Sequence, residues 1–509
     1  MSAKYDHEAV KDVADPSSTQ TTISPITGQP IVVRRLPSVN DVDRILYKSH
    51  VAHLKWRQVP LSKRIELVKA GITHLSSRAT ELAQEITEQM GRPIRYTEGE
   101  IKTFEDRANW LVGKAESALK DENVDEGRPE GIKRTIRRAP VGITFLIGSW
   151  NFPYMIQVNA LIPSLLAGNS VILKPSPQTP LTSERVVEAF TAAGLPSDLL
   201  QCVHLNPIQM DMVVAHPLVP FVSFTGSVEN GRKVEIAAAS KVRQGFKMVG
   251  LELGGKDAAY VREDSDPKYA AENIVDGAMF NSGQSCCAVE RVYVHEKIYD
   301  AFVEECVKVV KGYVLGDPRE QATTLGPVVS LRSAAAIRSH IAEAVQMGAK
   351  ALIPDSHFPE AKEGTTYVAP QVLVDVNHSM KVMMEETFGP VMGIMKVSCA
   401  LSVQAAFKQS RTESDDFFLP QVSSDAEALK LINESPYGLT GSIWTKSEAA
   451  FEALVDHVET GTVFMNRCDY LDPALPWTGV KNSGRGISLS RYGFDAVTRA
   501  KSVHVRPLA

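Results

Sequence analysis

The sequence has no apolar run of the roughly eighteen residues that a membrane-spanning helix requires. Its first twenty residues are polar and include four acidic side chains, so neither a secretory signal peptide nor an Arg-rich transit peptide is visible. Cysteine is scarce as well: six in 509 residues, two of them adjacent, are too few for a disulfide framework. These absences predict a soluble protein of a reducing compartment, and we expect the cytoplasm.

A strong excess of charge of one sign is also missing. Lys and Arg total 55 and Asp and Glu total 60, for a net charge of -5. This balance excludes the basic surface typical of proteins that bind nucleic acid or anionic membranes, so we expect a small-molecule ligand. With 44% hydrophobic and 23% charged residues, the composition is that of a globular protein, and the length predicts two or three packed domains.

The order of apolar segments predicts an α/β fold. Residues 60–120 carry apolar side chains at helical spacing, whereas residues 140–148 and 170–173 are apolar strands separated by a helix, which is a parallel crossover unit. Further strands end near residues 226 and 255. Because ligands of an open α/β sheet bind beyond the carboxyl ends of its strands, these ends predict a single crevice.

Cys286 is the candidate nucleophile of that crevice. It follows Gly283, Gln284 and Ser285, small or polar residues that leave a thiol accessible to backbone amides able to stabilise a thiolate. The alternative is that Cys286 and Cys287 are two small buried hydrophobic residues. The segment by itself supports both interpretations equally.

Two polar residues at strand ends are candidates for the same chemistry. Glu252 follows an apolar strand, and burial there raises the pKa of a carboxyl towards values useful for a general base; the alternative is a solvent-facing residue at a diglycine turn. The Asn151 amide is able to stabilise an oxyanion, or else merely caps the helix that begins near Pro153. Each segment alone favours the simpler alternative.

Four further residues at strand ends are suited to a nucleotide. Lys174 and Ser176 offer groups for ribose hydroxyls or phosphate, and Gly226 and Ser227 open a helix whose amides suit a pyrophosphate. Taken alone, this segment is explained better by an ordinary strand-to-helix turn, since the three-glycine dinucleotide fingerprint is absent.

Taken in order, Asn151, Lys174, the turn 224–231, Glu252, Cys286 and the segment 385–390 resemble the motif set of the aldehyde dehydrogenase superfamily. The resemblance covers residues 20 to 506 and is closest to a hydrolytic branch of broad specificity. It implies an α/β fold with a Rossmann-type dinucleotide-binding domain (20–121 and 139–253), a catalytic domain (254–465) and a small β oligomerisation flap (122–138 and 485–509). A homodimer or homotetramer follows, because an exposed edge strand is normally covered.

The resemblance also implies roles for individual residues. Cys286 attacks the aldehyde, Asn151 and the Cys286 amide hold the oxyanion, and Glu252 activates the water that hydrolyses a thioester. The residues implied in binding NAD or NADP are Trp150, Lys174, Ser176, Gly226, Ser227, Leu253, Glu386 and Phe388. The residues implied in lining a substrate tunnel are Phe152, Asn159, Ser285, Cys287 and Trp477, and no metal is implied.

Several positions depart from the family pattern. Pro177 stands where many NAD-preferring relatives have a glutamate, which leaves NAD and NADP both open, whereas a carboxylate at Asp198 disfavours extra phosphate and tilts the choice towards NAD. For a substrate carboxylate the sequence offers only Arg467, which is equally suited to bridging two subunits. The preserved Cys286, Glu252 and Asn151 argue against a non-enzymatic role. A cysteine hydrolase or acyltransferase without redox chemistry is the remaining alternative.

Residues 397–421 form an insert that the family pattern lacks. An intron retained in the coding sequence is one hypothesis, because GTAAGT, a common intron start, encodes Val397-Ser398, and residues 417–421 are readable as a pyrimidine-rich tract followed by CAG. This hypothesis implies a eukaryotic source. The other hypothesis is a surface loop, which the polar run 408–416 permits.

Overall fold

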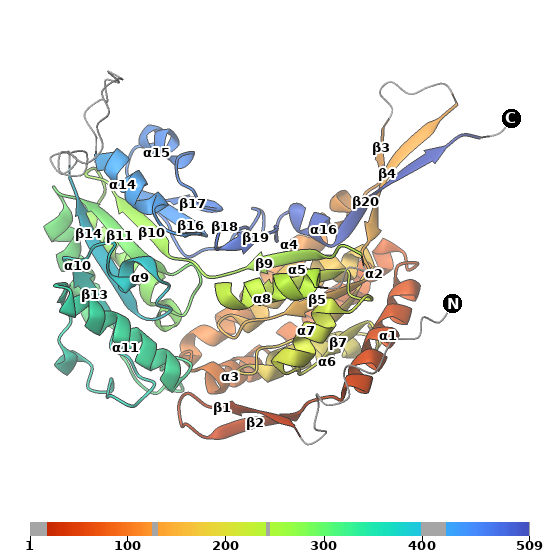
Figure 1. The fold of residues 1–509 in the computed structure, drawn as a ribbon, viewed down its shortest axis with the longest axis horizontal. Coiled ribbons are helices and arrows are strands. Elements are labelled where there is room, and N and C mark those ends of the chain that lie inside the picture. The colour runs from red at the N-terminus through yellow and green to blue at the C-terminus, as the bar shows by residue number, and fades with distance from the viewer. Residues whose placement is uncertain (1–17, 125–130, 241–244, 399–423, 508–509) are drawn as a thin grey trace.

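The structure is a computed structural model that describes residues 18–124, 131–240, 245–398 and 424–507. Two α/β lobes lie side by side, and a narrow β arm projects from one of them (Figure 1). Each lobe is built around its own mainly parallel sheet, which confirms the predicted fold class. No helix in the described ranges is long and apolar enough to cross a membrane.

The sheet of the first lobe has the doubly wound order β9-β8-β5-β6-β7, in which all neighbours are parallel, with the short β19 (Gly484–Arg485) antiparallel on the edge of β9. The chain reverses its direction of winding between β5 and β8, which is where such sheets bind ligands. The strands are β5 (Ile143–Ile147), β6 (Ser170–Lys174), β7 (Leu200–Cys202), β8 (Phe221–Thr225) and β9 (Met248–Glu252).

Helices cover this sheet and bury their apolar stripes against it. In α2, Val68, Ile72 and Leu75 recur at helical spacing and are fully buried, as the sequence pattern predicts. The helices of this lobe are α1 (Val39–Trp56), α2 (Leu61–Ser76), α3 (Ala79–Met90), α4 (Ile94–Ala118), α5 (Pro153–Ala167), α6 (Pro180–Ala192), α7 (Pro207–Ala215) and α8 (Val228–Ala239).

The sheet of the second lobe has the order β12-β13-β14-β11-β10-β16-β17, parallel except for β12. Its strands are β10 (Asp257–Val261), β11 (Val289–His295), β12 (Lys350–Ala351), β13 (Gln371–Val374), β14 (Val391–Val397), β16 (Thr440–Trp444) and β17 (Thr462–Met465). The helices are α9 (Pro267–Met279), α10 (Tyr299–Lys311), α11 (Leu331–Gln346), α12 (Lys381–Met384), α14 (Ser424–Asn433) and α15 (Glu448–Val455).

The arm consists of β3 (Glu122–Asn123), β4 (Lys133–Pro140) and β20 (Thr498–Val505), and β20 pairs antiparallel with β4 along its whole length (Figure 1). Residues 485–497 lie on the body of the molecule, where α16 (Tyr492–Ala496) buries Phe494 in the core of the first lobe. The remaining pairs are β1 (Thr19–Ile23) with β2 (Pro30–Arg35) and β15 (Tyr437–Gly438) with β18 (Val480–Lys481).

The predicted insert lies almost entirely outside the described residues. Val397 ends β14 and is fully buried, and α14 begins at Ser424. The Ser398 N–H donates to the Glu427 carboxylate at 3.1 Å. The two ends that flank the insert are therefore adjacent in space.

Candidate active site

The loop that carries Cys286 follows α9 through a tight left-handed turn. Asn281, Ser282 and Gly283 all have positive φ values, of 54°, 56° and 70°. A Cβ atom on Gly283 would lie 2.1 Å from the Gly389 carbonyl oxygen, so only glycine fits there. The Gln284 side chain accepts from the Val329 N–H at 2.8 Å and donates to the Asn281 carbonyl at 3.0 Å, which fixes the loop.

The two adjacent cysteines have different environments. Cys286 is half-buried and faces open space, whereas Cys287 is 3% exposed and donates its S–H to the Asp469 carboxylate at 2.9 Å. Hydrogen bonding to Cys286 and burial raise the pKa of Cys287 well above its usual value. Cys287 therefore stays a thiol, and Cys286 is the accessible sulfur of the pair.

Gly254 and Gly255, which follow Glu252 and Leu253, allow three segments of the chain to pack closely together. A Cβ on Gly255 would lie 2.2 Å from the Cys286 carbonyl oxygen, and one on Gly254 would lie 2.2 Å from the Glu386 carboxylate. The Gly255 N–H donates to Glu386 at 3.0 Å. The Leu-Gly-Gly sequence is thus the place where the first lobe's strand end, the cysteine loop and the segment 385–390 are in contact.

The Asn151 side chain lies against the cysteine loop. It is 3% exposed, and its amide nitrogen donates to the Gln284 carbonyl at 3.2 Å. The residue that caps α5 is Phe152, and no side chain forms a capping hydrogen bond there. The helix-capping alternative for Asn151 is therefore excluded.

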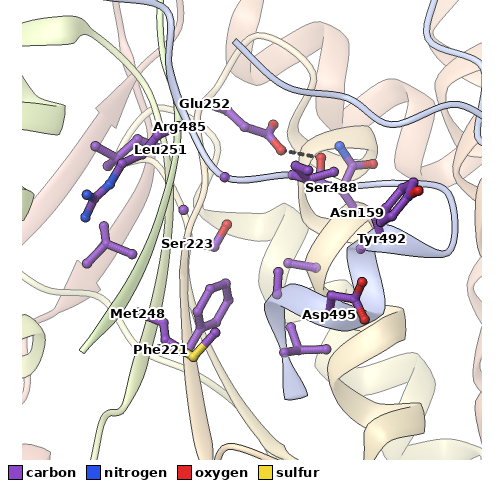
Figure 2. Close-up of a pocket in the computed structure, with 18 residues that line it drawn as sticks. Asn159, Phe221, Ser223, Met248, Leu251, Glu252, Arg485, Ser488, Tyr492 and Asp495 are labelled. Atoms are coloured by element: carbon purple, nitrogen blue, oxygen red, sulfur yellow. Dashed lines mark hydrogen bonds between the residues drawn. The ribbon is translucent and has the colours of Figure 1, made fainter. Parts of the chain in front are cut away.

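Glu252 ends β9 and is half-buried between the two lobes. Its carboxylate accepts from the Ser488 hydroxyl at 2.5 Å (Figure 2). Burial raises the pKa of Glu252, and the Ser488 hydroxyl, the Arg107 charge and the Thr225 hydroxyl oppose that rise. Ser488 lies 236 residues later in the chain, and no local pattern in the sequence predicts this contact.

Two cavities meet at these residues. One, of about 600 Å³, runs over the carboxyl ends of β5, β6, β8 and β9, and the other, of about 620 Å³, opens between α4, α5 and the cysteine loop. Both are lined by Asn151, Thr225, Glu252 and Cys286. A third cavity, of about 240 Å³, reaches Glu252 between β9, α5 and α16 (Figure 2).

The first cavity brings together every residue that the sequence assigned to a nucleotide cofactor: Trp150, Lys174, Ser176, Gly226, Ser227, Leu253, Glu386 and Phe388. Burial lowers the pKa of Lys174 to about 8, and its ammonium has no hydrogen bond or ion pair to any residue in the described part of the chain. The N-terminus of α8 also faces this space. An unpaired buried cation beside a helix N-terminus fits an anionic dinucleotide.

The segment 385–390 is held at the edge of the same cavity. The Glu290 carboxylate forms an ion pair with Lys256 and accepts from the Thr387 and Phe388 N–H groups at 2.9 and 3.0 Å. The Phe388 ring then packs edge-on against Trp150, with ring centroids 5.5 Å apart. Burial raises the pKa of Glu386 to about 8.

Some of the residues that bear on the choice between NAD and NADP line the cofactor cavity, and others do not. Pro177, Asp211 and Lys233 line the cofactor cavity. Asp198 is half-buried and is not among the residues that line this cavity, and its carboxylate lies 3.9 Å from the Lys48 ammonium. The carboxylate on which the preference for NAD was based therefore lies outside the cofactor cavity.

The second cavity is lined by all five residues predicted for the substrate tunnel: Phe152, Asn159, Ser285, Cys287 and Trp477. It also contains residues that the sequence analysis did not select, among them Arg92, Arg107 and Asp469. Burial raises the pKa of Asp469 to about 7, although the Cys287 and Ser285 side chains donate to it. Arg467 is exposed and stacks on the Tyr470 ring at 3.4 Å.

In the described ranges, no three His, Cys, Asp or Glu side chains are grouped so that they could hold a metal ion. The residues present at the site include a half-buried thiol, a carboxyl group whose pKa is raised and hydrogen-bond donors. The chemistry available to them is therefore covalent and acid–base catalysis beside a nucleotide pocket.

Comparisons with known proteins agree with this geometry. The model of the aldehyde dehydrogenase family matches residues 13–407 and 418–503, and the interruption falls inside the predicted insert. A betaine aldehyde dehydrogenase of Sinorhizobium fredii is 31% identical over 98% of this chain and 96% of its own length.

Solved structures show the same fold. An NAD-dependent aldehyde dehydrogenase from Sinorhizobium meliloti is 29% identical, with a TM-score of 0.85 over 97% of this chain and 93% of its own. An NADP-dependent glyceraldehyde-3-phosphate dehydrogenase from Bacillus halodurans C-125, complexed with NADP, is 28% identical, with a TM-score of 0.85 over 96% of both chains. The chain belongs to the aldehyde dehydrogenase family and is an enzyme that oxidises aldehydes with a nicotinamide dinucleotide.

Proposed function

We propose that Cys286 is the nucleophile of a hydrolytic aldehyde dehydrogenase. The observation that carries the proposal is that Cys286, Glu252 and Asn151 line both cavities at the point where they meet. An aldehyde entering from the second cavity reaches the Cys286 sulfur, and the thiolate adds to its carbonyl carbon to give a thiohemiacetal. A nicotinamide dinucleotide held in the first cavity would supply the acceptor for the hydride that leaves this carbon.

Asn151 is proposed to stabilise the oxyanion of the thiohemiacetal. Its amide group is already held beside the cysteine loop by the hydrogen bond to Gln284, so little reorganisation is needed when charge develops. One such donor is worth about 3 kcal/mol in other enzymes. The backbone N–H of Cys286 is the second donor that we propose.

Glu252 is proposed to activate the water that hydrolyses the thioester. Its raised pKa suits a general base, and the Ser488 hydroxyl holds one carboxylate oxygen. The cavity between β9, α5 and α16 offers a route for this water (Figure 2). A carboxylic acid is then the product.

The cofactor is proposed to be either NAD or NADP. Lys174 and Ser176 would hold the adenine ribose, the N-terminus of α8 the pyrophosphate, and Glu386 and Phe388 the nicotinamide ribose and ring. Pro177 leaves room where a glutamate would repel a 2'-phosphate, and the unpaired Lys174 ammonium favours anions. We therefore expect NADP to be accepted as well as NAD.

The test follows reduced cofactor by its near-ultraviolet absorbance, with aliphatic and aromatic aldehydes and with both cofactors. Cofactor reduction that Cys286→Ser abolishes is the expected result. A cysteine hydrolase or acyltransferase would instead cleave esters or thioesters, would reduce no cofactor with any aldehyde, and would have no use for the first cavity.

Assembly and location are further proposals. The outer edge of β20 has no partner strand within the described residues, so we propose that a second subunit covers it in a dimer or tetramer. Light scattering on the intact chain and on a variant that ends at Val497 tests this. The described cysteines are free thiols, which supports the cytoplasm and is testable by fractionation.

A further inference from the structure

Arg107 is a buried arginine of α4 that lines the substrate cavity. Only 5% of it is exposed, and it shares the cavity wall with Cys286 and Glu252. One terminal nitrogen donates to the Met155 carbonyl and to the Asn159 side-chain oxygen, both at 3.4 Å, beyond the usual range of such bonds. The buried Nε has no hydrogen-bond partner.

The charge of Arg107 is also unpaired. Within residues 18–124, 131–240, 245–398 and 424–507, no carboxylate lies within 4.0 Å of its guanidinium. The neighbouring Arg92, by contrast, has partners within the protein: it forms a 2.5 Å ion pair with Glu100, donates to Asn281 at 3.0 Å and stacks over Phe152. The charge of Arg92 is thus neutralised by a protein carboxylate, whereas the charge of Arg107 is not.

Burying a guanidinium without a neighbouring anion is energetically unfavourable. Arginine does not relieve this by deprotonation, because its guanidinium stays charged under ordinary conditions. Burial accordingly lowers the pKa of Arg107, and the charge of Glu252 is the main opposing influence. Glu252 nevertheless forms no ion pair with it. The group that pairs with Arg107 is therefore expected to come from outside the protein.

The other residues of the cavity indicate the chemistry of that group. Aromatic side chains such as Phe152, Phe280 and Trp477 line part of the wall. The charged lining residues are the arginines Arg92, Arg95 and Arg107 and the acidic residues Glu100, Asp106, Glu252 and Asp469, of which Glu100 is paired with Arg92. A second arginine, Arg95, is exposed at the rim, where its guanidinium lies 5.3 Å from the Tyr96 ring centroid. A guanidinium binds the planar, two-oxygen carboxylate through two parallel hydrogen bonds, and the geometry of the two groups matches.

We propose that Arg107 binds a carboxylate of the substrate, so that the preferred substrates are aldehydes that carry a carboxylate at their other end. This inference rests on the proposed function, since it needs the aldehyde carbon at Cys286. It also predicts that an aldehyde with a quaternary ammonium group is a poor substrate, because its cation would face Arg107.

The experiment compares aldehydes that differ only in charge. Succinic semialdehyde is paired with its methyl ester, and 4-carboxybenzaldehyde with methyl 4-formylbenzoate. Two scaffolds are used because the distance between carboxylate and aldehyde differs between them. In the wild-type enzyme, kcat/KM for the carboxylate member of at least one pair is expected to exceed that of its ester by about 100-fold.

The variants are Arg107→Met, Arg107→Lys and the control Arg467→Met, which removes an exposed guanidinium near the same cavity. Arg107→Met is expected to remove the preference through a higher KM for the carboxylate substrate, whereas KM for the ester is expected to change by less than about threefold. Arg107→Lys is expected to restore part of the preference. Arg467→Met is expected to leave the ratio unchanged.

Three results overturn the inference. The first is a wild-type enzyme that oxidises both members of each pair equally well. The second is an Arg107→Met enzyme that slows both members equally and shifts the pH profile of kcat, since Arg107 would then act only on Glu252. The third is a preference that disappears in Arg467→Met instead. Failure of the proposed function is distinguishable, because neither acid nor ester would then reduce any cofactor.

Discussion

The substitution Gly255→Ala tests how closely the cysteine loop approaches the first lobe. A Cβ at this position would lie 2.2 Å from the Cys286 carbonyl oxygen, 2.9 Å from an Asp257 carboxylate oxygen and 3.3 Å from the Leu439 Cβ. The closest of these atoms belongs to the backbone, so a change of side-chain rotamer cannot relieve the contact. The cysteine loop itself has to move.

The size of the effect follows from this distance. Ordinary contact begins near 3.4 Å, so the Cys286 carbonyl has to shift by about 1 Å. A misplacement of about 1 Å at a reacting group costs on the order of 100-fold in rate. Overpacking of this kind lowers the free energy of unfolding by about 1–3 kcal/mol, so the variant is expected to fold.

The assay measures kcat/KM at a saturating cofactor concentration, together with the thermal midpoint of unfolding. Gly113→Ala is the matched control, because nothing lies within 4 Å of its Cβ and it is an exposed position inside α4. Replacing a helical glycine by alanine stabilises by about 0.5–1 kcal/mol, so this control should be slightly more stable and fully active. A Gly255→Ala enzyme that keeps kcat/KM within about threefold of wild type would refute the reasoning.

Other perturbations address the remaining parts of the site. Glu252→Gln should retain a burst of cofactor reduction and accumulate acyl-enzyme, visible by mass spectrometry, with kcat reduced by about 100-fold or more; loss of the burst would mean that Glu252 also activates the thiol. Ser488→Ala removes a hydrogen bond that lowers the pKa of Glu252, so the rise of kcat with pH should move to higher pH, and an unmoved profile contradicts this role. Lys174→Met should raise KM for the cofactor about tenfold with little change in kcat, and in the wild-type enzyme KM should rise as pH passes about 8, where the ammonium loses its proton. A chain without residues 399–423 should fold and stay active, because the Ser398 N–H already contacts Glu427; inactive or insoluble protein would favour a real loop, as would transcripts that contain the insert as the dominant form.

The environment of Glu252 shows how segments far apart in the sequence combine at one carboxyl group. The strand end comes from the first lobe, Ser488 from the segment before α16, and Arg107 from α4. Burial by all three elements raises the pKa of the carboxyl, while the hydroxyl and the guanidinium limit the rise.

The sequence by itself determined the fold class and the residues at the strand ends. Lys174, Thr225 and Glu252 each end an apolar parallel strand, and the connection between parallel strands places such ends on one edge of a sheet. The sequence also predicted Cys286 and the diglycine Gly254-Gly255 as parts of the site. Both could be selected because each belongs to a short segment whose residue types are informative on their own. The cofactor residues and tunnel residues named from the family pattern line the two cavities.

Only the tertiary structure decided which side chains meet across the chain. Ser488, Asp469 and Arg107 lie on segments with no local pattern that distinguishes them, and they reach the site because whole helices and loops pack there. Packing likewise showed that Phe152 rather than Asn151 caps α5, that Asp198 lies outside the cofactor cavity, and that Cys287 donates to Asp469. Burial sets charge states and pairing, and burial is a property of the folded chain that no single segment of sequence contains.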